Sequence, residues 1–300
     1  MLIDAFTFYN EADLLQLRLQ TLREAVDYFI IVEMGLTHSG IRKPLLLADR
    51  LDRLDAPREK IVYIGVYDWP RVDVRNERER WVLENHQRDC IVRGLDQLGA
   101  GADDVLLISD LDEIPDPNAL GPASAALAER PFVAFAQVYR KHFVNALPIS
   151  IMRTPLWLGT VATRAGMVQK LTPTAIRRGD ADRSAQLWSG TGLRSDTAYL
   201  NPAGWHFTYF GGPVADAIKH SSIVEGCYAH QSGGFELPPP SRHNHADGRT
   251  EAVEQWLARS GVVALPATWG STGGLRYLPK PLLEHPDEWE RLWWYNQPPP

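Results

Sequence analysis

The fold of this chain is decided by one short stretch, Val105-Leu106-Leu107-Ile108-Ser109-Asp110-Leu111-Asp112-Glu113-Ile114-Pro115. It begins as an apolar run, which is typical of a fully buried strand, and it ends in clustered acids before a proline stops the strand. Adjacent carboxylates at a buried strand end repel one another and lose solvation. Because alternate residues of a strand point to the same side, Asp110 and Asp112 could share one Mg²⁺ or Mn²⁺ ion. The alternative is a polar turn in which an aspartate caps the next helix.

The composition limits the class of protein. Of the 300 residues, 44% are hydrophobic and 23% are charged, which is typical of a globular chain with one large core or two modest ones. The net charge of −6 argues against a general nucleic-acid binder. The two cysteines, Cys90 and Cys227, lie far apart and indicate a reducing compartment rather than a disulfide framework. The chain shows neither a signal-peptide pattern nor an apolar run of about 20 residues. We therefore expect a cytoplasmic protein, either free or peripheral to the membrane.

The N-terminal part of the chain has the pattern of a parallel α/β sheet. Strands are predicted over 2–8, 27–33, 61–66, 131–138 and 140–144, besides the one that begins at Val105. Helices are predicted from Asn10 to Leu22 and over 45–54, 76–98, 118–129, 213–224 and 247–259. Strand, helix and strand of these lengths form βαβ units with right-handed crossovers. Residues 151–192 are predicted to be rich in loops and suited to ligand contact.

Further polar residues are expected at the carboxyl edge of this sheet, where open α/β sheets bind their ligands. Glu33 ends the second predicted strand. The loop Thr37–Pro44 is small, polar and basic, which suits nucleotide or phosphate contacts, although a solvated loop is the alternative. The charged helix segment Glu84–Arg88 could lie under the acid loop, although a solvated helix face is the default for such a run.

The second half of the chain adds a histidine and a basic pair. A short aromatic strand, Gly204-Trp205-His206-Phe207, contains a histidine that is either part of a site or a hydrogen-bonded core residue. Arg177 and Arg178 could clamp a phosphate by bidentate contacts, and a solvated basic loop is the alternative.

Several short segments, taken together and in order, resemble glycosyltransferase family 17. They are residues 3–11, 31–33, 43–44, 84–88, 108–115 and 204–207. This family contains the β-1,4-mannosyl-glycoprotein β-1,4-N-acetylglucosaminyltransferases and many bacterial members. The resemblance covers roughly residues 2–230, and little of the last 70 residues matches. It implies an inverting, nucleotide-sugar-dependent transferase with a GT-A-type, Rossmann-like fold.

The resemblance also implies roles for single residues. Asp110 and Asp112 match the D-x-D motif, which in GT-A enzymes holds the ribose and the metal-bound diphosphate, and Glu113 extends that motif. His206 matches a late histidine that completes the metal shell in several such enzymes. The residues implied to bind the nucleotide-sugar donor are Asn10, Glu11, Glu33, Lys43, Arg88 and Asp110.

These observations predict an α/β protein with a mainly parallel central sheet flanked by helices and a loop-rich C-terminal part. We expect a GT-A-like catalytic domain over residues 1–230, with a donor half at about 1–117 and an acceptor half at about 118–230. Residues 231–300 are expected to be an extension packed on the same domain.

The predicted reaction is metal-dependent, inverting transfer of a sugar from a UDP-sugar, with UDP-GlcNAc favoured by the resemblance, to a glycan or another hydroxyl acceptor. A carboxylate would take the acceptor's proton as general base. The later acids and Glu113 are the candidates, and Asp196 is favoured because it lies just before the Gly-Trp-His strand. Mn²⁺ and Mg²⁺ both suit the predicted metal ligands Asp110, Asp112 and His206.

Two other classes of protein share some of these features. Paired aspartates at a strand end also serve metal-dependent phosphohydrolases and nucleotidyltransferases. Ten tryptophans favour a non-catalytic sugar-binding protein, because aromatic faces suit sugar rings. Three clustered carboxylates speak against simple binding.

Overall fold

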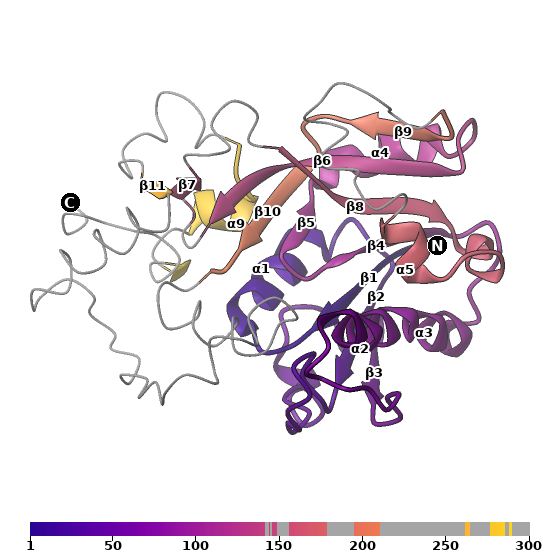
Figure 1. Cartoon of the computed structure of the whole chain (residues 1–300). Coiled ribbons are helices and arrows are strands. Elements are labelled where there is room, and N and C mark those ends of the chain that lie inside the picture. The colour runs from indigo at the N-terminus through magenta and orange to yellow at the C-terminus, as the bar shows by residue number, and fades with distance from the viewer. Residues whose placement is uncertain are drawn as a thin grey trace, which may run out of the picture.

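The computed structural model describes residues 1–141, 144, 146–148, 156–178, 195–210, 262–264, 277–285 and 288–289. Its strands are β1 (Leu2–Phe8), β2 (Tyr28–Met34), β3 (Ile61–Val66), β4 (Val105–Asp110), β5 (Glu113–Pro115), β6 (Phe132–Lys141), β7 (Ala146–Pro148), β8 (Leu156–Arg164), β9 (Thr197–Leu200), β10 (Gly204–Thr208) and β11 (Val262–Ala264). Its helices are α1 (Ala12–Leu22), α2 (Glu77–Asp89), α3 (Ile91–Leu98), α4 (Pro117–Ala126), α5 (Pro173–Arg178) and α9 (Lys280–Glu284), with short 3-10 helices at Leu51–Arg53, Arg58–Lys60 and Ala165–Gln169. Figure 1 shows these elements arranged around one twisted sheet.

The sheet has the strand order β3-β2-β1-β4-β8-β6-β10-β5, with β9 paired to β6. The first four of these strands are parallel, and their ends are aligned, because Thr7 pairs with Asp110 and Phe8 pairs with Glu33. Beyond them, β8 runs antiparallel to both β4 and β6, and β10 runs parallel to β6. The predicted α/β architecture with a mainly parallel sheet flanked by helices is confirmed by this order.

Helices cover both faces of the sheet, as the alternation of its side chains requires. Phe29 and Ile31 of β2 belong to the same core cluster as α1, α4 and α9. Ile30 and Val32 point the other way, into the core with α2, α3 and α5. In Figure 1, α2 and α3 lie together in front of β2 and β3. The carboxyl ends of β1, β2 and β4 are therefore left open between two helical layers.

Two predicted helices differ from the structure. The segment 45–54 contains only the 3-10 turn Leu51–Arg53, and the backbone N–H groups of Leu46 and Leu47 donate to the carboxylate of Glu33. The helix predicted over 76–98 is divided at Cys90 into α2 and α3. The spacing of hydrophobic residues shows neither the missing helical turns at 45–50 nor the change of direction at Cys90.

The second half of the sheet departs most from the prediction. Residues 156–164 of the predicted loop-rich region form β8, and the two strands predicted around 131–144 form the single strand β6. Gly159 of β8 lies where an added side chain would collide with Gln137, and the β6–β8 register shifts between Ala134 and Ala136. A glycine and a bulge interrupt the alternation that indicates a strand.

The acid stretch is divided between two strands, because β4 ends at Asp110 and a second strand ends at the predicted stop, Pro115. Glu113–Pro115 forms the short edge strand β5, which pairs antiparallel with β10. The alternative of a helix-capping aspartate is also present, but at Asp116, which follows the acids at 110–113. Asp116 Oδ1 accepts the backbone N–H of Asn118 at 2.9 Å and caps α4.

Part of the C-terminal region contacts the sheet domain. Leu278, Leu282 and Trp289 belong to the core cluster that contains α1. The helices predicted over 213–224 and 247–259 lie outside the described residues. Among the helices that the structure describes, none is long and apolar enough to cross a membrane.

Candidate active site

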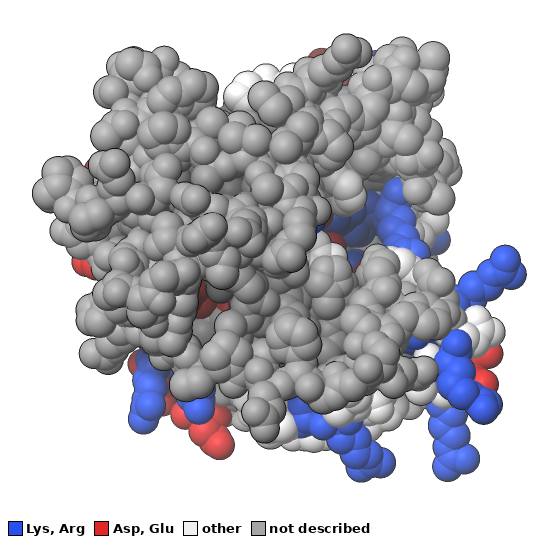
Figure 2. Space-filling view, turned by 60° about the vertical axis from the view of Figure 1, so that its left-hand side comes forward, with Lys and Arg blue, Asp and Glu red and all other residues white. Residues whose placement is uncertain are grey.

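A pocket with a volume of about 730 Å³ opens at the carboxyl edge of the sheet. Its wall includes the ends of β1, β4 and β10, one side of α2 and the end of α5, and it contains five acidic side chains: Glu11, Glu84, Asp110, Asp112 and Glu113. Arg88, Arg177 and Arg178 lie in the same wall. In Figure 2 a recess shows basic side chains beside acidic atoms. The pocket therefore brings opposite charges together where a parallel sheet binds ligands.

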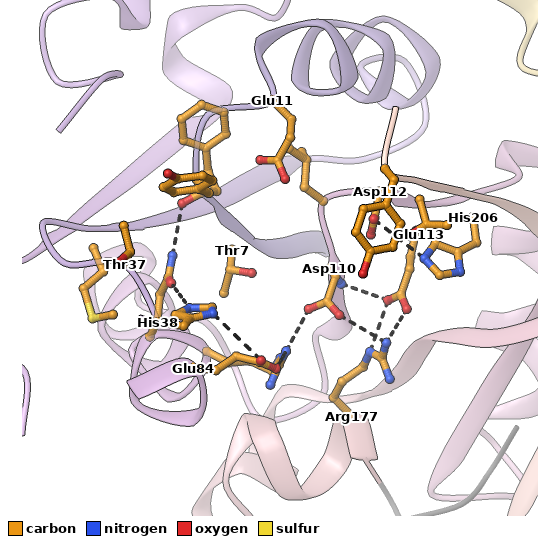
Figure 3. A pocket seen from close by; sticks show the side chains of 18 of the residues that line it. Thr7, Glu11, Thr37, His38, Glu84, Asp110, Asp112, Glu113, Arg177 and His206 are labelled. Atoms are coloured by element: carbon orange, nitrogen blue, oxygen red, sulfur yellow. Dashed lines mark hydrogen bonds and ion pairs between the residues drawn. The ribbon is translucent and has the colours of Figure 1, made fainter. Parts of the chain in front are cut away.

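Asp110 is the last residue of β4, and two arginines hold its carboxylate (Figure 3). Arg88 Nη2 donates to Oδ1 at 2.8 Å, and Arg177 Nη2 lies 3.4 Å from Oδ2. Burial would raise the pKa of Asp110, but the charges of Arg88 and Arg177 outweigh it and hold the pKa well below its usual range. Asp110 is therefore an anion paired with guanidinium groups.

Glu113 is the most enclosed acid of the pocket, with 1% of its surface exposed. Its Oε1 accepts from Trp157 Nε1 at 2.7 Å and from Arg177 Nη2, and its Oε2 accepts from Arg177 Nε at 3.2 Å and from the backbone N–H of Asp110 at 2.9 Å. Burial raises the pKa of Glu113, and Arg177 counters part of that rise. Each carboxylate oxygen of Glu113 thus accepts two hydrogen bonds. This geometry favours a structural role, in which Glu113 fixes Arg177 and the acid loop, over a role as proton acceptor.

The carboxylate of Asp112 faces the imidazole of His206 (Figure 3), with 3.7 Å between Oδ2 and Nε2. The imidazole lies between the rings of Tyr139 and Trp157, at 4.9 Å and 5.0 Å between centroids. Its Nδ1 is buried and has no hydrogen-bond partner in the described part of the chain, so aromatic packing fixes the ring. β10 brings the histidine here by pairing His206 with Glu113 on one side and Tyr139 on the other.

The predicted metal ligands fit a cation in part. A carboxylate oxygen and an imidazole nitrogen that face each other suit a divalent ion such as Mn²⁺, and Asp112 and His206 provide them. Asp110 directs both oxygens to arginines instead. Among the described residues, no group of three His, Cys, Asp or Glu side chains is arranged to hold a metal ion.

The helix segment Glu84–Arg88 does lie under the acid loop. Gln87 Nε2 donates to the backbone carbonyls of Phe8 at 3.1 Å and Val32 at 2.9 Å, which fastens α2 to the ends of β1 and β2. Its Oε1 then faces His38 Nε2 at 2.9 Å. Arg88 is 3% exposed and bridges Glu84 and Asp110, both at 2.8 Å. Sequence reasoning did not single out Gln87 or His38 as site residues.

Arg177 and Arg178 at the end of α5 make different contacts. Arg177 holds Asp110 and Glu113 from below the acid loop. Arg178 is more exposed, packs its guanidinium 4.4 Å from the ring centre of Trp81 and lies 3.6 Å from Glu84. Arg178 is thus the pocket arginine that a ligand reaches most readily.

Glu33 is not among the residues that line the pocket, although it is the penultimate residue of β2 at the same sheet edge. It points in the same direction as Phe29 and Ile31, toward α1, whereas Met34 faces the pocket. It is fully buried and accepts from Lys43 Nζ at 2.5 Å, from the N–H groups of Leu46 and Leu47 at 2.7 and 3.0 Å, and from Tyr63 Oη at 2.9 Å. Its carboxylate anchors the loop 43–47 and is not available to a donor ribose.

Of the other residues predicted to bind the sugar donor near the N-terminus, two line the pocket and one does not. Glu11 and Lys43 line the pocket, and Lys43 lies 5.6 Å from the ring centre of Tyr9 while it binds Glu33. Asn10 is not among the lining residues, and its N–H donates to Glu11 Oε2 at 3.1 Å.

Asp196 is not brought to the pocket. It precedes β9, whose first residue, Thr197, pairs with the first residue of β6. The pocket is at the other end of β6, where Tyr139 lies seven residues further along. At about 3.3 Å per residue this separation is about 23 Å. β9 and β10 run along β6 in the same direction, β9 beside Phe132–Phe135 and β10 beside Val138–Lys141, so the extended chain between them places Asp196 at the opposite end of β6 from His206.

Replacing Glu33 by Gln is expected to lower the free energy of unfolding by about 3 kcal/mol, because one amide cannot accept from all four donors and leaves Lys43 without its counter-ion. Urea unfolding measures this change. Glu24→Gln is the matched control, since Glu24 is 90% exposed and should shift stability by less than about 0.5 kcal/mol. Equal effects of the two variants would contradict the anchoring role.

The comparison with known proteins bears on the strands and the helix that form half of this pocket. Residues 1–122 match the family model of glycosyltransferase family 17. Over 117 residues the chain is 29% identical to the β-1,4-mannosyl-glycoprotein 4-β-N-acetylglucosaminyltransferases of Rattus norvegicus and Homo sapiens, which covers 38% of this chain and 21% of each relative. The chain therefore spans about a fifth of the length of these curated relatives.

Solved structures superpose only loosely. A galactosyltransferase, LgtC, in complex with donor and acceptor sugar analogues is 13% identical, with a TM-score of 0.37 over 90% of this chain and 99% of that chain. TarS from S. aureus is 14% identical, with a TM-score of 0.38 over 77% of this chain and 69% of that one.

The segment that matches the family model, residues 1–122, contains Glu84, Arg88 and the acid loop from Asp110 to Glu113. The rest of the pocket comes from beyond the match, where β8, α5 and β10 contribute Trp157, Arg177 and His206. The resemblance is thus confirmed for residues 1–122, which include Asp110 and Asp112, and the fold brings the later residues of the pocket next to them.

Proposed function

We propose that this protein is a glycosyltransferase that moves a sugar from a nucleotide diphosphate sugar to a hydroxyl acceptor in the pocket around the Asp110–Glu113 loop. The observation that carries the proposal is the meeting of Asp112 and His206 with a cluster of arginines at the carboxyl edge of the sheet. The match of residues 1–122 to family 17 supports it. The domain limits at 230 and the cytoplasmic location remain predictions.

A cation at this site, Mn²⁺ or Mg²⁺, would be held by Asp112 and His206 and would supply positive charge to the diphosphate of the donor. Arg178, at the accessible side of the pocket, can add a charge-assisted contact to a phosphate. Arg88 and Arg177 hold the carboxylates of Asp110 and Glu113 in place, and their charges keep Asp110 ionised.

The acceptor side of the pocket is proposed to be its aromatic wall. Tyr139, Trp157 and Tyr209 line the pocket next to His206, and aromatic faces suit sugar rings. The acceptor hydroxyl loses its proton as it attacks the anomeric carbon, and an inverting reaction needs a carboxylate of the pocket as the proton acceptor. UDP-GlcNAc is favoured as donor because the matched relatives are N-acetylglucosaminyltransferases.

A thermal-shift panel tests the donor site. UDP and UDP-GlcNAc with Mn²⁺ are expected to raise the melting temperature by several degrees, since a ligand at about 100 times its Kd stabilises the native state by about 2.7 kcal/mol. The same nucleotides without Mn²⁺, and CDP and GDP with Mn²⁺, serve as controls. A folded protein whose melting temperature moves with none of them would overturn the donor-site proposal.

The rival reactions give different products from the same mixture. A transferase should release UDP from the donor faster when a sugar acceptor is present and should form a glycoside. A phosphohydrolase or nucleotidyltransferase would cut the diphosphate and release UMP or a sugar phosphate. Separation of the products by chromatography distinguishes these outcomes, and binding without turnover would favour the sugar-binding class.

A further inference from the structure

Among the residues that the structure describes, the most enclosed basic side chain, Arg18, lies behind the acid loop. Arg18 of α1 is fully buried, and so is its ionic partner Asp4 of β1. Arg18 Nε and Nη2 donate to the two oxygens of Asp4 at 2.8 and 2.6 Å, and the guanidinium carbon lies 4.4 Å from the ring centre of Phe6. This bidentate pair uses only part of the donor capacity of the guanidinium.

The remaining donors of Arg18 converge on the backbone of the acid loop. Nη1 lies within hydrogen-bond distance of three carbonyl oxygens, those of Asp110 at 3.0 Å, Leu111 at 3.1 Å and Glu113 at 3.0 Å. Nη2 also donates to Ser109 Oγ at 2.6 Å. One side chain thus contacts four residues of the segment 109–113 from the side opposite the pocket.

These contacts supply hydrogen-bond donors to backbone carbonyls of the turn. Between β4 and β5 the chain leaves the sheet ladder, and buried carbonyls without ladder partners need other donors. A buried ion pair is weak evidence for stability by itself, since apolar residues of similar volume often serve as well. An Arg–Asp pair whose spare donors all reach one turn is therefore better explained by the shape of that turn.

We propose that Arg18 is a positioning residue, which holds the Asp110–Glu113 turn in the shape that presents Asp110 and Asp112 to the donor site. The catalytic consequence of this role rests on the proposed glycosyltransferase function. It concerns the loop's order directly, so it can be tested with or without a nucleotide.

The first variant is Arg18→Lys. An ammonium keeps the charge beside Asp4 but has three donors and no fork, so it cannot serve Asp4, Ser109 and three carbonyls together. Hydrogen exchange of peptides that cover 105–116, followed by mass spectrometry, reports the order of the loop. We expect the loop amides to exchange at least about tenfold faster than in the wild type, while peptides from β6 change little.

Arg80→Lys is the matched control. Arg80 is also buried, with 2% exposure, lies on α2 outside the pocket and reaches the carbonyl of Val74 at 3.4 Å. Like Arg18→Lys, this substitution removes a buried guanidinium, but one that is not in contact with the acid loop. Its exchange at 105–116 should match the wild type.

A second variant covers the case in which Arg18→Lys does not fold. Asp4→Leu combined with Arg18→Met replaces the whole pair by apolar side chains, which removes the donors to the loop without leaving a buried charge. A stable double variant with a fast-exchanging loop supports the proposal. A stable double variant whose loop exchanges like the wild type shows that Arg18 serves only the core and overturns it.

Nucleotide binding adds a readout that separates the two proposals. If the wild type binds UDP with Mn²⁺, the Kd should rise at least about tenfold in Arg18→Lys and stay within about twofold in Arg80→Lys. An unchanged Kd in Arg18→Lys would contradict the positioning role. If the wild type binds no nucleotide, the proposed function fails, and hydrogen exchange still decides whether Arg18 orders the turn.

Discussion

Asp112→Asn is expected to lose at least about a hundredfold in sugar transfer. Changing a residue that only supports a metal ligand already costs about 10- to 100-fold in metal affinity or activity, so changing a ligand itself should cost at least as much. Asp112 is 6% exposed and its Oδ2 faces His206 Nε2 at 3.7 Å, which makes it the acid best placed to share a cation with that histidine. Asparagine keeps the shape of the side chain and removes its charge.

Asp196→Asn is the matched control for this experiment, because the substitution is the same and the residue lies at the far end of β6. It should retain the wild-type rate. Release of UDP in the presence of an acceptor measures the rate, and the Kd for UDP with Mn²⁺ replaces it while the acceptor is unknown. Thermal unfolding must show both variants folded. Wild-type binding by Asp112→Asn, or a loss confined to Asp196→Asn, would sink the assignment of the site.

The acid loop could be predicted because its signal is local. An apolar run that ends in acids indicates a buried strand end with a ligand, and the structure has β4 ending at Asp110. The same alternation rule could have placed Glu33 correctly. Glu33 shares the parity of Phe29 and Ile31, which face α1, so it could not also face a pocket lined by Met34. The sequence indicates correctly that Glu33 lies near a strand end, whereas the side of the sheet to which it points follows only from the alternation with Phe29 and Ile31.

Long-range features were less accessible. The role of Arg177 depends on β8 and α5 returning the chain to the acid loop, and nothing in its neighbours in sequence indicates Glu113 as its partner. Arg18 did leave a signal, because it lies on the helix face of Leu14, Leu15 and Leu22, three or four residues from each. A charge within an apolar stripe predicts a buried pair, although the partner and the contacts with the loop emerge only from the fold.

Arg177→Met is expected to lower the free energy of unfolding by about 3–5 kcal/mol at pH 8, the usual cost of removing one partner from a buried ion pair. Glu113, with 1% of its side chain exposed, would keep its burial and lose its cation. Arg178→Met is the control from the adjacent position. The Arg178 side chain is 38% exposed and lies 3.6 Å from Glu84, so its loss should cost about 1 kcal/mol or less.

The pH dependence of the Arg177→Met variant gives the sharper test. Burial already raises the pKa of Glu113, and without Arg177 the folded-state pKa should rise further above the value of about 4.3 in the unfolded chain. The native state then binds a proton where the unfolded state does not, so stability must fall as pH rises through that folded-state pKa. Urea unfolding of wild type and variant at pH 5 and pH 8 should therefore show a smaller stability gap at pH 5. A gap that widens toward acid, or one no larger than that of Arg178→Met, would mean that Arg177 does not stabilise the charged form of Glu113.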